Sequence, residues 1–253
     1  GDSAVSDRVT IIPDYYSEAY TTTPADFICS RHVLEHIADP VAFLRMVRRA
    51  IGDRVNTAVF FEVPNMAYTL HNMAIWDIIY EHCSYFTPQS LRYLFTRCGF
   101  RVLAVNTTYA GQFLTIEAMP DDASSDLPAG EHIQELETAV SQFGRHLQEK
   151  ITHWQHTLHS LHQQNQHATI WGVGSKGVTF LNLMDTARQI PYAIDINPRK
   201  HGKYVTGTGQ PIHPPEHLQQ HPPDLIILMN PIYQDEIRQM TSNMGLSPKF
   251  TLA

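Results

Sequence analysis

Apolar and polar positions in the first third of the chain alternate between two periods, one typical of strands and one typical of helices. The segment "ADFICSRHV" begins with a short apolar strand, and "DPVAFLRMVRRAI" then carries apolar residues at helical spacing. Asp39 can cap that helix, Pro40 suits its first position and Gly52 ends it. The continuous apolar run "TAVFFEVP" predicts a strand covered on both faces.

The alternation continues toward the middle of the chain. "TPQSLRYLFTRCGF" predicts a second helix, capped by Thr87 and ended by Gly99. "RVLAVNTTY" and "QFLTIEAMP" predict two strands around Gly111. Repeated strands and helices argue for an α/β sandwich. The polar, short residues from Pro120 to Gly130 then predict a linker.

A long helix is predicted from Glu131 to Gln166. It can pack along a sheet or against a second copy of the chain, and structural packing is the favoured interpretation. Its apolar stripe comprises Ile133, Leu136, Val140, Phe143, Leu147, Ile151, Trp154, Leu158 and Leu161. The same helix carries histidines at every third position: His153, His156, His159 and His162. Each such step falls about 60° short of a full turn, so the four cannot converge on one metal ion and form a solvated face instead.

The last third is a second α/β pattern with a glycine turn. "ATIWGVGSKGVTFLNLM" predicts strand, turn and helix, and "PYAIDINP" predicts a strand ending at Asp195. Gly172, Gly174 and Gly177 fit G-x-G-x-x-G, and Asp195 follows about 20 residues later, as in dinucleotide sites. The alternative is a tight turn without a nucleotide. Lys176 inside the turn can meet an anion directly.

Composition narrows the class without giving the chemistry. The chain has 253 residues, 43% hydrophobic and 17% charged, which suggests one or two domains with a real core. A net charge of −7 argues against nucleic acid as a partner. No apolar run approaches the ~20 residues that cross a bilayer, and we expect no signal peptide. Three widely spaced cysteines fit a reducing cytoplasm.

Two polar clusters are candidates for chemistry. In "SRHVLEHIADP", His36 and its polar neighbours follow a strand end, where ligands bind in open α/β sheets; capping and surface polarity are the alternative. In "IYEHCSYF", Glu81 and His82 stand among aromatic residues. Burying them unpaired would cost on the order of several kcal/mol. His82 suits general-base chemistry, but the two share a pocket only on a turn. An ion-paired rim beside the core is the alternative.

Six segments, taken in order, resemble one family, the S-adenosylmethionine-dependent sugar-nucleotide C-methyltransferases: "DFICSRHVLEHIADPVAFL", "IYEHCSYFTPQSLRYLFTRCGF", "AGQFLTIEA", "WGVGSKG", "IDINPRKHGKYVTGT" and "NPIYQDEI". The resemblance covers nearly the whole chain, and the ordered set is more specific than any one motif. It implies a partial Rossmann-like methyltransferase domain followed by a second Rossmann-like α/β domain. It also implies a nucleotide-linked keto sugar as substrate and S-adenosylmethionine as methyl donor.

The resemblance implies roles for particular residues. His82 matches the histidine that removes the proton alpha to the ketone, and Glu81 matches the glutamate before it. His36 matches a histidine that can polarise the keto oxygen. Ser30 and Arg31 fall near the methyl-donor site. Substrate contacts are expected from Tyr80, Tyr85, Gly174 and Lys176, with Lys176 near a phosphate.

Two departures from the family pattern accompany the match. The family motif begins with tyrosine, whereas Ile79 stands here and cannot donate a hydrogen bond. The glycine-rich turn and the acidic residue that bind the donor are absent before Asp26, as are the cysteines of the family's zinc domain. We therefore expect a C-terminal fragment of a longer enzyme, which by itself binds S-adenosylmethionine poorly.

These observations predict three segments: residues 1–119 as the latter half of a methyltransferase domain, 120–130 as a linker and 131–253 as a Rossmann-like substrate-binding domain. The predicted activity is methyl transfer to an enolisable carbon of a keto sugar or a similar substrate. Two alternatives remain, a non-catalytic nucleotide-binding module and an NAD-dependent oxidoreductase that uses the "GVGSKG" turn. The expected partners are a small-molecule substrate and a second copy of the chain. No metal ion, nucleic acid or membrane is expected.

Overall fold

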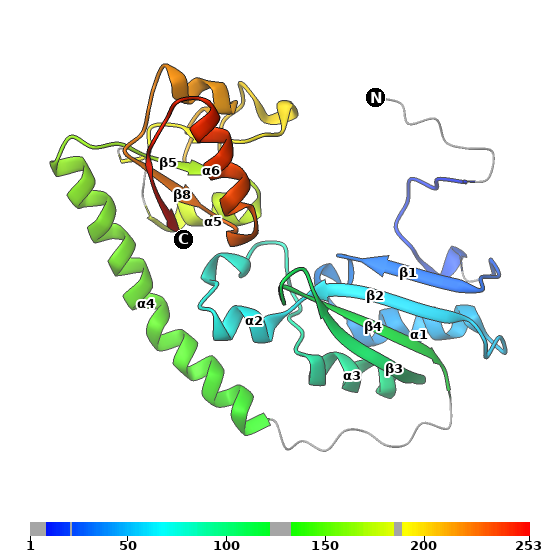
Figure 1. Ribbon diagram of the computed structural model, residues 1–253. Coiled ribbons are helices and arrows are strands. Elements are labelled where there is room, and N and C mark those ends of the chain that lie inside the picture. The colour runs from blue at the N-terminus through cyan, green and yellow to red at the C-terminus, as the bar shows by residue number, and fades with distance from the viewer. Residues whose placement is uncertain (1–8, 21, 122–132, 185–188) are drawn as a thin grey trace. The chain divides into compact units, whose positions relative to one another are not determined.

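The computed structural model describes residues 9–20, 22–121, 133–184 and 189–253 (Figure 1). Contacts within the chain divide it into two compact units. The first unit comprises residues 1–64, 83–108 and 113–129, and the second comprises residues 65–82, 109–112 and 130–253. The predicted division at residues 120–130 stays a prediction, and residues 122–130 of that linker lie outside the described ranges.

A four-stranded sheet in the order β1-β2-β4-β3 forms the centre of the first unit. β1 (Phe27–Arg31) and β2 (Ala58–Pro64) are parallel. β4 (Phe113–Pro120) is antiparallel to both β2 and β3 (Phe100–Thr108). The predicted strands are confirmed. The insertion of β4 between β2 and β3 makes the sheet mixed.

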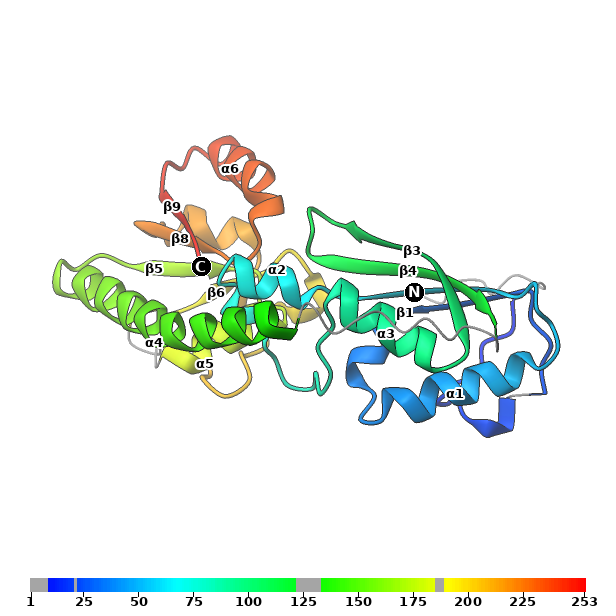
Figure 2. The ribbon, with the colours of Figure 1, turned by 90° about the horizontal axis from the view of Figure 1, so that it is seen from below.

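Two capped helices cover one face of this sheet (Figure 2). α1 (Pro40–Ile51) begins after Asp39, whose side chain accepts an N–H from the first turn. α3 (Pro88–Arg97) begins after Thr87, which forms a reciprocal capping box with Ser90. Both predicted caps are confirmed. The helices and sheet share one core, which includes Leu44, Val47, Phe61, Val63, Leu91, Phe95, Leu114 and Ile116.

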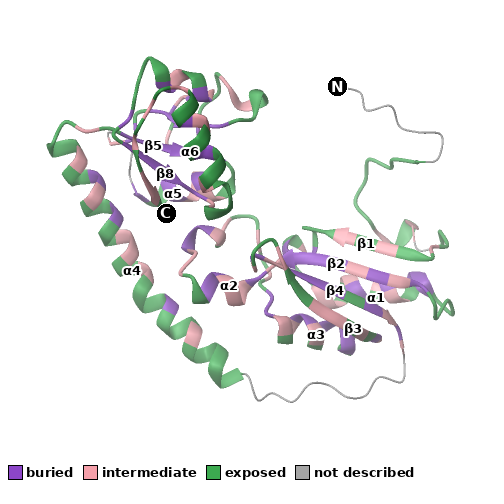
Figure 3. Ribbon diagram, viewed as in Figure 1, coloured by how far each residue is buried: buried purple, intermediate pink, exposed green. Residues whose placement is uncertain are grey.

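A five-stranded parallel sheet in the order β7-β6-β5-β8-β9 forms the centre of the second unit. β5 and β8 are buried on both faces, as strands of parallel sheets usually are (Figure 3). The α/β class and the second Rossmann-like sheet are confirmed. The strands are β5 (Ala168–Trp171), β6 (Ala193–Ile194), β7 (Ile212–His213), β8 (Leu225–Leu228) and β9 (Lys249–Leu252).

Each face of this sheet has its own core, because successive strand residues point to opposite sides. Ile170 and Ile227 belong to the core beside α4 (Ile133–Gln163) and α5 (Ser175–Met184). Trp171, Ile226 and Leu228 belong to the core beside α6 (Gln234–Asn243). Figure 2 shows α6 on one side of the sheet and α4 and α5 on the other.

The segment 65–82 packs into the second unit although it follows β2 in sequence. It contains α2 (Met66–His71) and a short 3-10 helix, η3 (Ile75–Asp77). Trp76 is 3% exposed, and its ring meets Phe180 with centroids 4.8 Å apart. Burial of this large aromatic side chain joins the segment to α5.

The apolar stripe of α4 is buried along only part of its length. Phe143, Trp154 and Leu158 are buried, whereas Ile133 and Val140 are 59% and 50% exposed. Packing of the stripe is thus confirmed for its later turns, and association of two copies stays a prediction. The four histidines predicted to form a solvated face are exposed, as expected: His153, His156, His159 and His162.

The remaining elements are short. Among the described residues, no helix combines the length and the apolar character needed to cross a membrane. Within the described ranges the other 3-10 helices are η1 (Glu18–Tyr20), η2 (Leu34–His36), η5 (Pro198–Lys200), η6 (Pro215–Gln219) and η7 (Pro231–Tyr233).

Candidate active site

The carboxyl end of β1 carries the two residues predicted to contact the methyl donor. Ser30 is half-buried, and Arg31 is the last residue of the strand. The Arg31 guanidinium donates from Nε and Nη2 to Glu62 Oε1, at 3.0 and 2.8 Å. Glu62 lies opposite Arg31 in the parallel strand β2. Both charges therefore lie near the end of the sheet where ligands bind in open α/β folds.

His32, the first residue after β1, is held between two buried carboxylates. Its Nδ1 lies 3.3 Å from Glu35 Oε1, and its Nε2 lies 3.1 Å from Glu62 Oε1. Its ring also meets Phe113 edge-on. Glu35 and Glu62 are 1% and 6% exposed, and buried charges need such partners. The second oxygen of Glu35, Oε2, has no hydrogen-bond partner among the described residues.

Glu35 also fixes the chain that follows the "IYEH" motif. Its carbonyl oxygen accepts the N–H groups of Cys83 and Ser84, at 2.9 and 3.1 Å. The Ser84 hydroxyl donates to the Ile37 carbonyl at 3.2 Å. Cys83 and Ser84 belong to the first unit, whereas His82 is the last residue of a segment of the second. His82 is therefore linked to the anchored segment by its peptide bond to Cys83.

The motif itself is a turn rather than a strand. The His82 N–H donates to the Ile79 carbonyl at 2.9 Å, and the backbone from residue 80 to residue 85 is a turn followed by irregular structure. Tyr80 is 93% exposed. Glu81 is also exposed, so it does not carry the burial cost that was considered for Glu81 and His82 from the sequence. His82 is half-buried. The other two predicted site residues of the first unit are exposed: His36 and Tyr85.

The three glycines of "GVGSKG" differ in whether the structure of the turn requires them. Gly172 has a φ of +100°, which other residues rarely adopt. A Cβ at position 177 would lie 2.2 Å from the Gly172 carbonyl oxygen, so only glycine fits there. A Cβ at position 174 would meet no atom within 4 Å. Gly172 and Gly177 are thus explained by the turn itself, whereas Gly174 faces open space.

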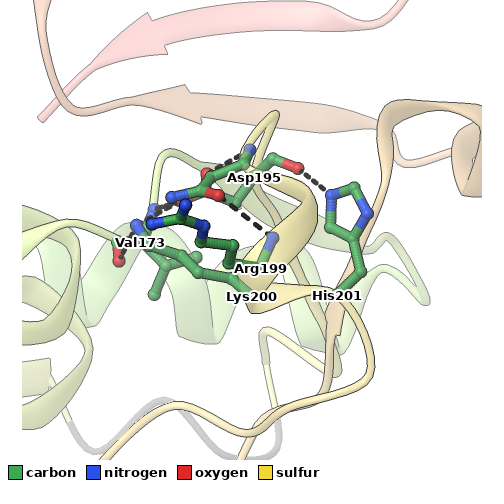
Figure 4. A network of polar contacts seen from close by, with 6 residues as sticks. Val173, Asp195, Arg199, Lys200 and His201 are labelled. Atoms are coloured by element: carbon green, nitrogen blue, oxygen red, sulfur yellow. Dashed lines mark hydrogen bonds and ion pairs between the residues drawn. The ribbon is translucent and has the colours of Figure 1, made fainter. Parts of the chain in front are cut away.

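Asp195 is committed to the turn and to the loop after β6 (Figure 4). Its Oδ2 accepts the Val173 N–H at 2.9 Å and Lys200 Nζ at 2.8 Å, and its Oδ1 accepts the Asn197 N–H at 2.9 Å. Burial alone would raise the pKa of Asp195, but the bonds from Lys200, Asn197 and Val173 outweigh it and hold the pKa below its usual value. Asp195 is 6% exposed and already accepts three hydrogen bonds, which leaves little of its carboxylate for a ribose hydroxyl.

Lys176 belongs to a polar cluster within the second unit. Its Nζ lies 2.7 Å from Asp77 Oδ1 and donates to Gln112 Oε1 at 3.1 Å. Gln112 in turn donates to Asn230 Oδ1 at 3.2 Å. Asn230 follows β8 as Gly172 follows β5, and β5 and β8 are neighbours at the point where the strand order reverses. Ligands of doubly wound sheets bind at this switch point.

Sequence reasoning did not identify several of these polar residues. Glu62 had a signal, since it is the one acidic residue in the apolar run "TAVFFEVP". Asn230 had a weaker signal, its position directly after an apolar strand. Asp77 and Gln112 had none, because only the tertiary structure brings them to Lys176.

Residues 117–247 match the family model for the C-terminal domain of C-methyltransferases, which covers more than half of the chain. The chain belongs to the C-methyltransferase family. Residues 4–105 separately match a methyltransferase domain model. The chain is also 26% identical over 224 residues to the C-methyltransferase NovU of Streptomyces niveus, a match that covers 84% of this chain.

The family match confirms the resemblance found in the ordered motifs. Both family models fall in the order expected from the sequence, methyltransferase domain first and C-terminal domain second. The chain spans about half of the length of the curated relative that it matches, since the alignment covers 53% of NovU.

Proposed function

We propose that this chain is part of an S-adenosylmethionine-dependent C-methyltransferase that acts on an enolisable carbon of a nucleotide-linked keto sugar or a similar substrate. The observation that carries the proposal is the anchoring of the "IYEHCSYF" segment. The chain directly after His82 is hydrogen-bonded to Glu35, one residue before His36. The bond between Glu35 and Cys83 therefore has one of the two proposed catalytic histidines next to each partner in the sequence. His36 follows Glu35, and His82 precedes Cys83.

In the proposed reaction His82 accepts the proton alpha to the ketone, and the C–H electron pair forms an enolate. Glu81 precedes the base and supports its charged form. His36 stabilises the negative charge that develops on the keto oxygen, the kind of electrostatic assistance that contributes most to many enzymatic rates. S-adenosylmethionine, when bound, supplies the methyl group that the enolate carbon takes up. Tyr80 and Tyr85, both exposed beside the motif, are proposed substrate contacts.

The replacement of the family tyrosine by Ile79 affects chemistry more than folding. The contact that Ile79 makes within the turn uses its backbone carbonyl, which accepts the His82 N–H. Any residue can make this bond, so the turn does not require the tyrosine hydroxyl. We propose that Ile79, in place of the family tyrosine, changes which substrate is accepted and leaves the conformation of the turn unchanged.

This chain supplies only part of a donor site. Ser30 and Arg31 are proposed to contact S-adenosylmethionine at the carboxyl end of β1, but the Arg31 guanidinium is already paired with Glu62. Residues 1–26 contain a single glycine, Gly1, and therefore no glycine-rich turn. The expectation of poor donor binding by this chain alone follows from both observations, and calorimetry with S-adenosylmethionine tests it.

We propose that the second unit binds the nucleotide part of the substrate. Gly174 leaves open space at the start of α5, and Lys176 supplies a positive charge in the first turn of that helix. Helix N-termini and lysine side chains both favour phosphate groups. Because Lys176 is paired with Asp77, a phosphate would have to share or displace that carboxylate.

An NAD-dependent function is the weaker alternative because Asp195 is engaged by Val173 and Lys200. Fluorescence titration distinguishes the two proposals. We expect a dTDP-sugar to bind this chain and NADH not to bind. NADH binding with a dissociation constant in the micromolar range would favour the oxidoreductase.

Substitution of the proposed base tests the reaction directly. The test uses a polypeptide that includes this sequence and has been shown to bind S-adenosylmethionine. In it we expect His82→Asn to abolish methyl transfer while the affinity for S-adenosylmethionine stays unchanged. His156→Asn, on the exposed face of α4, is the matched control and should retain full turnover. Turnover retained by His82→Asn would exclude His82 as the base. Nucleotide-sugar binding without turnover in the unaltered polypeptide would favour the non-catalytic module.

A further inference from the structure

Three histidines in the second unit form a continuous stack of imidazole rings. His213 ends β7, His217 lies in η6 and His221 follows that helix, at a regular spacing of four residues. The rings of His213 and His217 are nearly parallel, at 6°, with centroids 3.8 Å apart. The rings of His217 and His221 stack at 4.5 Å. The stack thus ties η6 and the chain after it to the edge of the sheet.

Tyr192 completes this cluster from the chain just before β6. Its ring meets His217 edge-on at 4.9 Å and His213 at 6.1 Å. Its hydroxyl donates to the His221 carbonyl at 2.6 Å. Tyr192 is 8% exposed, and burial raises its pKa to about 12, so it stays neutral across the range in which histidine titrates.

The stack is connected to the Asp195 network through the backbone. The Asp195 N–H donates to the His213 carbonyl at 3.1 Å, as part of the parallel pairing of β6 with β7. β7 is an edge strand of only two residues, Ile212–His213. Backbone bonds from Ile212 to Gly202 and Lys203 hold its first residue, whereas His213, its last residue, is joined to the sheet by the Asp195 bond and to η6 by the ring stack.

The groups that act electrostatically on His213 and His217 are other histidines. The pKa of His213 is lowered by burial, then by His221 and His201, and the pKa of His217 is lowered by burial, then by His213 and His221. Among the described residues no carboxylate forms an ion pair with the three stacked rings. Protonation of one ring therefore places its charge against neutral or cationic neighbours.

We propose that His213, His217 and His221 form an acid-sensitive latch, which holds the β7 edge and η6 closed at neutral pH and releases them at mildly acidic pH. Folding lowers the pKa values of two of these rings, so the unfolded or opened chain binds protons more readily than the latched one. The latch is thus fully stabilising above the ordinary histidine pKa of about 6.5 and weakens as the pH falls through the lower values of the folded state.

Amide hydrogen exchange at Asp195 measures opening of the latch, because that N–H is bonded to the His213 carbonyl. We compare exchange, corrected for the intrinsic chemical rate, at about pH 7.5 and about pH 5.5, the range in which histidine changes charge. The opening equilibrium should rise by at least about threefold at the lower pH, because the opened chain binds protons more readily than the latched one.

Two substitutions at the centre of the stack separate titration from packing. His217→Phe keeps an aromatic ring but cannot be protonated, so the acid-induced rise in opening should fall to less than about half. His217→Gln removes the ring as well, so opening should be frequent at both pH values. His156→Gln, exposed on α4, is the matched control and should behave as the unaltered chain. An acid response of Asp195 that is unchanged in His217→Phe would overturn the proposal, as would no response in the unaltered chain.

Discussion

The loops after β1 and after β5 both follow the carboxyl end of a parallel strand, but they use their polar groups differently. After β5, both oxygens of Asp195 accept hydrogen bonds from the turn and the adjoining loop. After β1, Glu35 pairs with His32 through one oxygen, and the other oxygen is buried without a partner among the described residues. The charge of Asp195 is thus satisfied by the turn after β5 and the loop after β6, whereas Glu35 in the loop after β1 retains an unused acceptor.

This difference indicates where ligand chemistry is to be sought. A buried polar group without a partner carries a cost, and such groups in native proteins usually have a reason. The "GVGSKG" turn, which is the most visible motif in the sequence, has an internal explanation for two of its glycines and for Asp195. The loop after β1 has no such internal explanation for Glu35 Oε2. Glu35 directly precedes His36, and its carbonyl binds the N–H groups of Cys83 and Ser84.

The largest expected effect distinguishes the glycines of the turn. Gly177→Ala places a Cβ 2.2 Å from a backbone oxygen, so we expect the second unit to lose about 3 kcal/mol of stability or more. Gly174→Ala meets no atom within 4 Å and should change stability by less than about 0.5 kcal/mol. All three tryptophans, Trp76, Trp154 and Trp171, lie in the second unit, so urea unfolding followed by tryptophan fluorescence reports this unit. Equal stabilities of the two variants would contradict the assigned role of Gly177.

Removal of the Asp195 charge should have a smaller, pH-dependent effect. Asp195→Asn weakens the bonds to Lys200 and Val173, and we expect a loss of about 2 kcal/mol at neutral pH. Because folding lowers the pKa of Asp195, its contribution is complete above the unfolded value of about 3.9 and is lost as the pH falls through the lower folded value.

The same fluorescence measurement checks this pH dependence. The stability difference between the unaltered chain and Asp195→Asn should narrow below about pH 4. Glu149→Gln, on the exposed side of α4, is the control and should change stability by less than about 0.5 kcal/mol. A difference that stays constant down to about pH 3 would show that the carboxylate charge does not stabilise the turn.

The sequence predicted most of the elements because local rules determine them. Asp39 and Thr87 mark helix starts by side-chain capping, and the apolar run around Phe61 marks a buried strand. The position of β4 between β2 and β3 could not be predicted, because strand order depends on pairings distant in sequence. The same limit applies to the segment 65–82, whose membership of the second unit depends on Trp76 meeting Phe180.

The candidate site shows the same division between local and distant information. Sequence motifs identified His36 and His82, and the turn at residue 79 is a local structure. Glu35 and Cys83 lie 48 positions apart in the sequence. The Glu35 carbonyl oxygen accepts both the Cys83 N–H and the Cys83 thiol. Neither spacing nor composition indicates that pairing, so the anchoring of the motif becomes visible only in the folded chain.

The smallest expected effect on stability is the most informative about the loop after β1. Glu35→Gln keeps the size of the side chain and a hydrogen-bonding group near His32, so the first unit should lose less than about 1 kcal/mol. Glu62→Gln is the matched control, because Glu62 pairs with both Arg31 and His32, and it should cost about 1 kcal/mol more than Glu35→Gln. Thermal unfolding followed by circular dichroism gives both values.

If Glu35 Oε2 serves the proposed reaction, Glu35→Gln should reduce methyl transfer by at least about tenfold, which corresponds to ~1.4 kcal/mol, although it barely changes stability. The loss should be in turnover rather than in the unfolding temperature, since the oxygen concerned makes no hydrogen bond within the described chain. The opposite result would be a Glu35→Gln variant whose free energy of unfolding is about 2 kcal/mol lower and whose turnover is unchanged. Glu35 would then be a structural residue like Asp195, and the unused acceptor would have no part in catalysis.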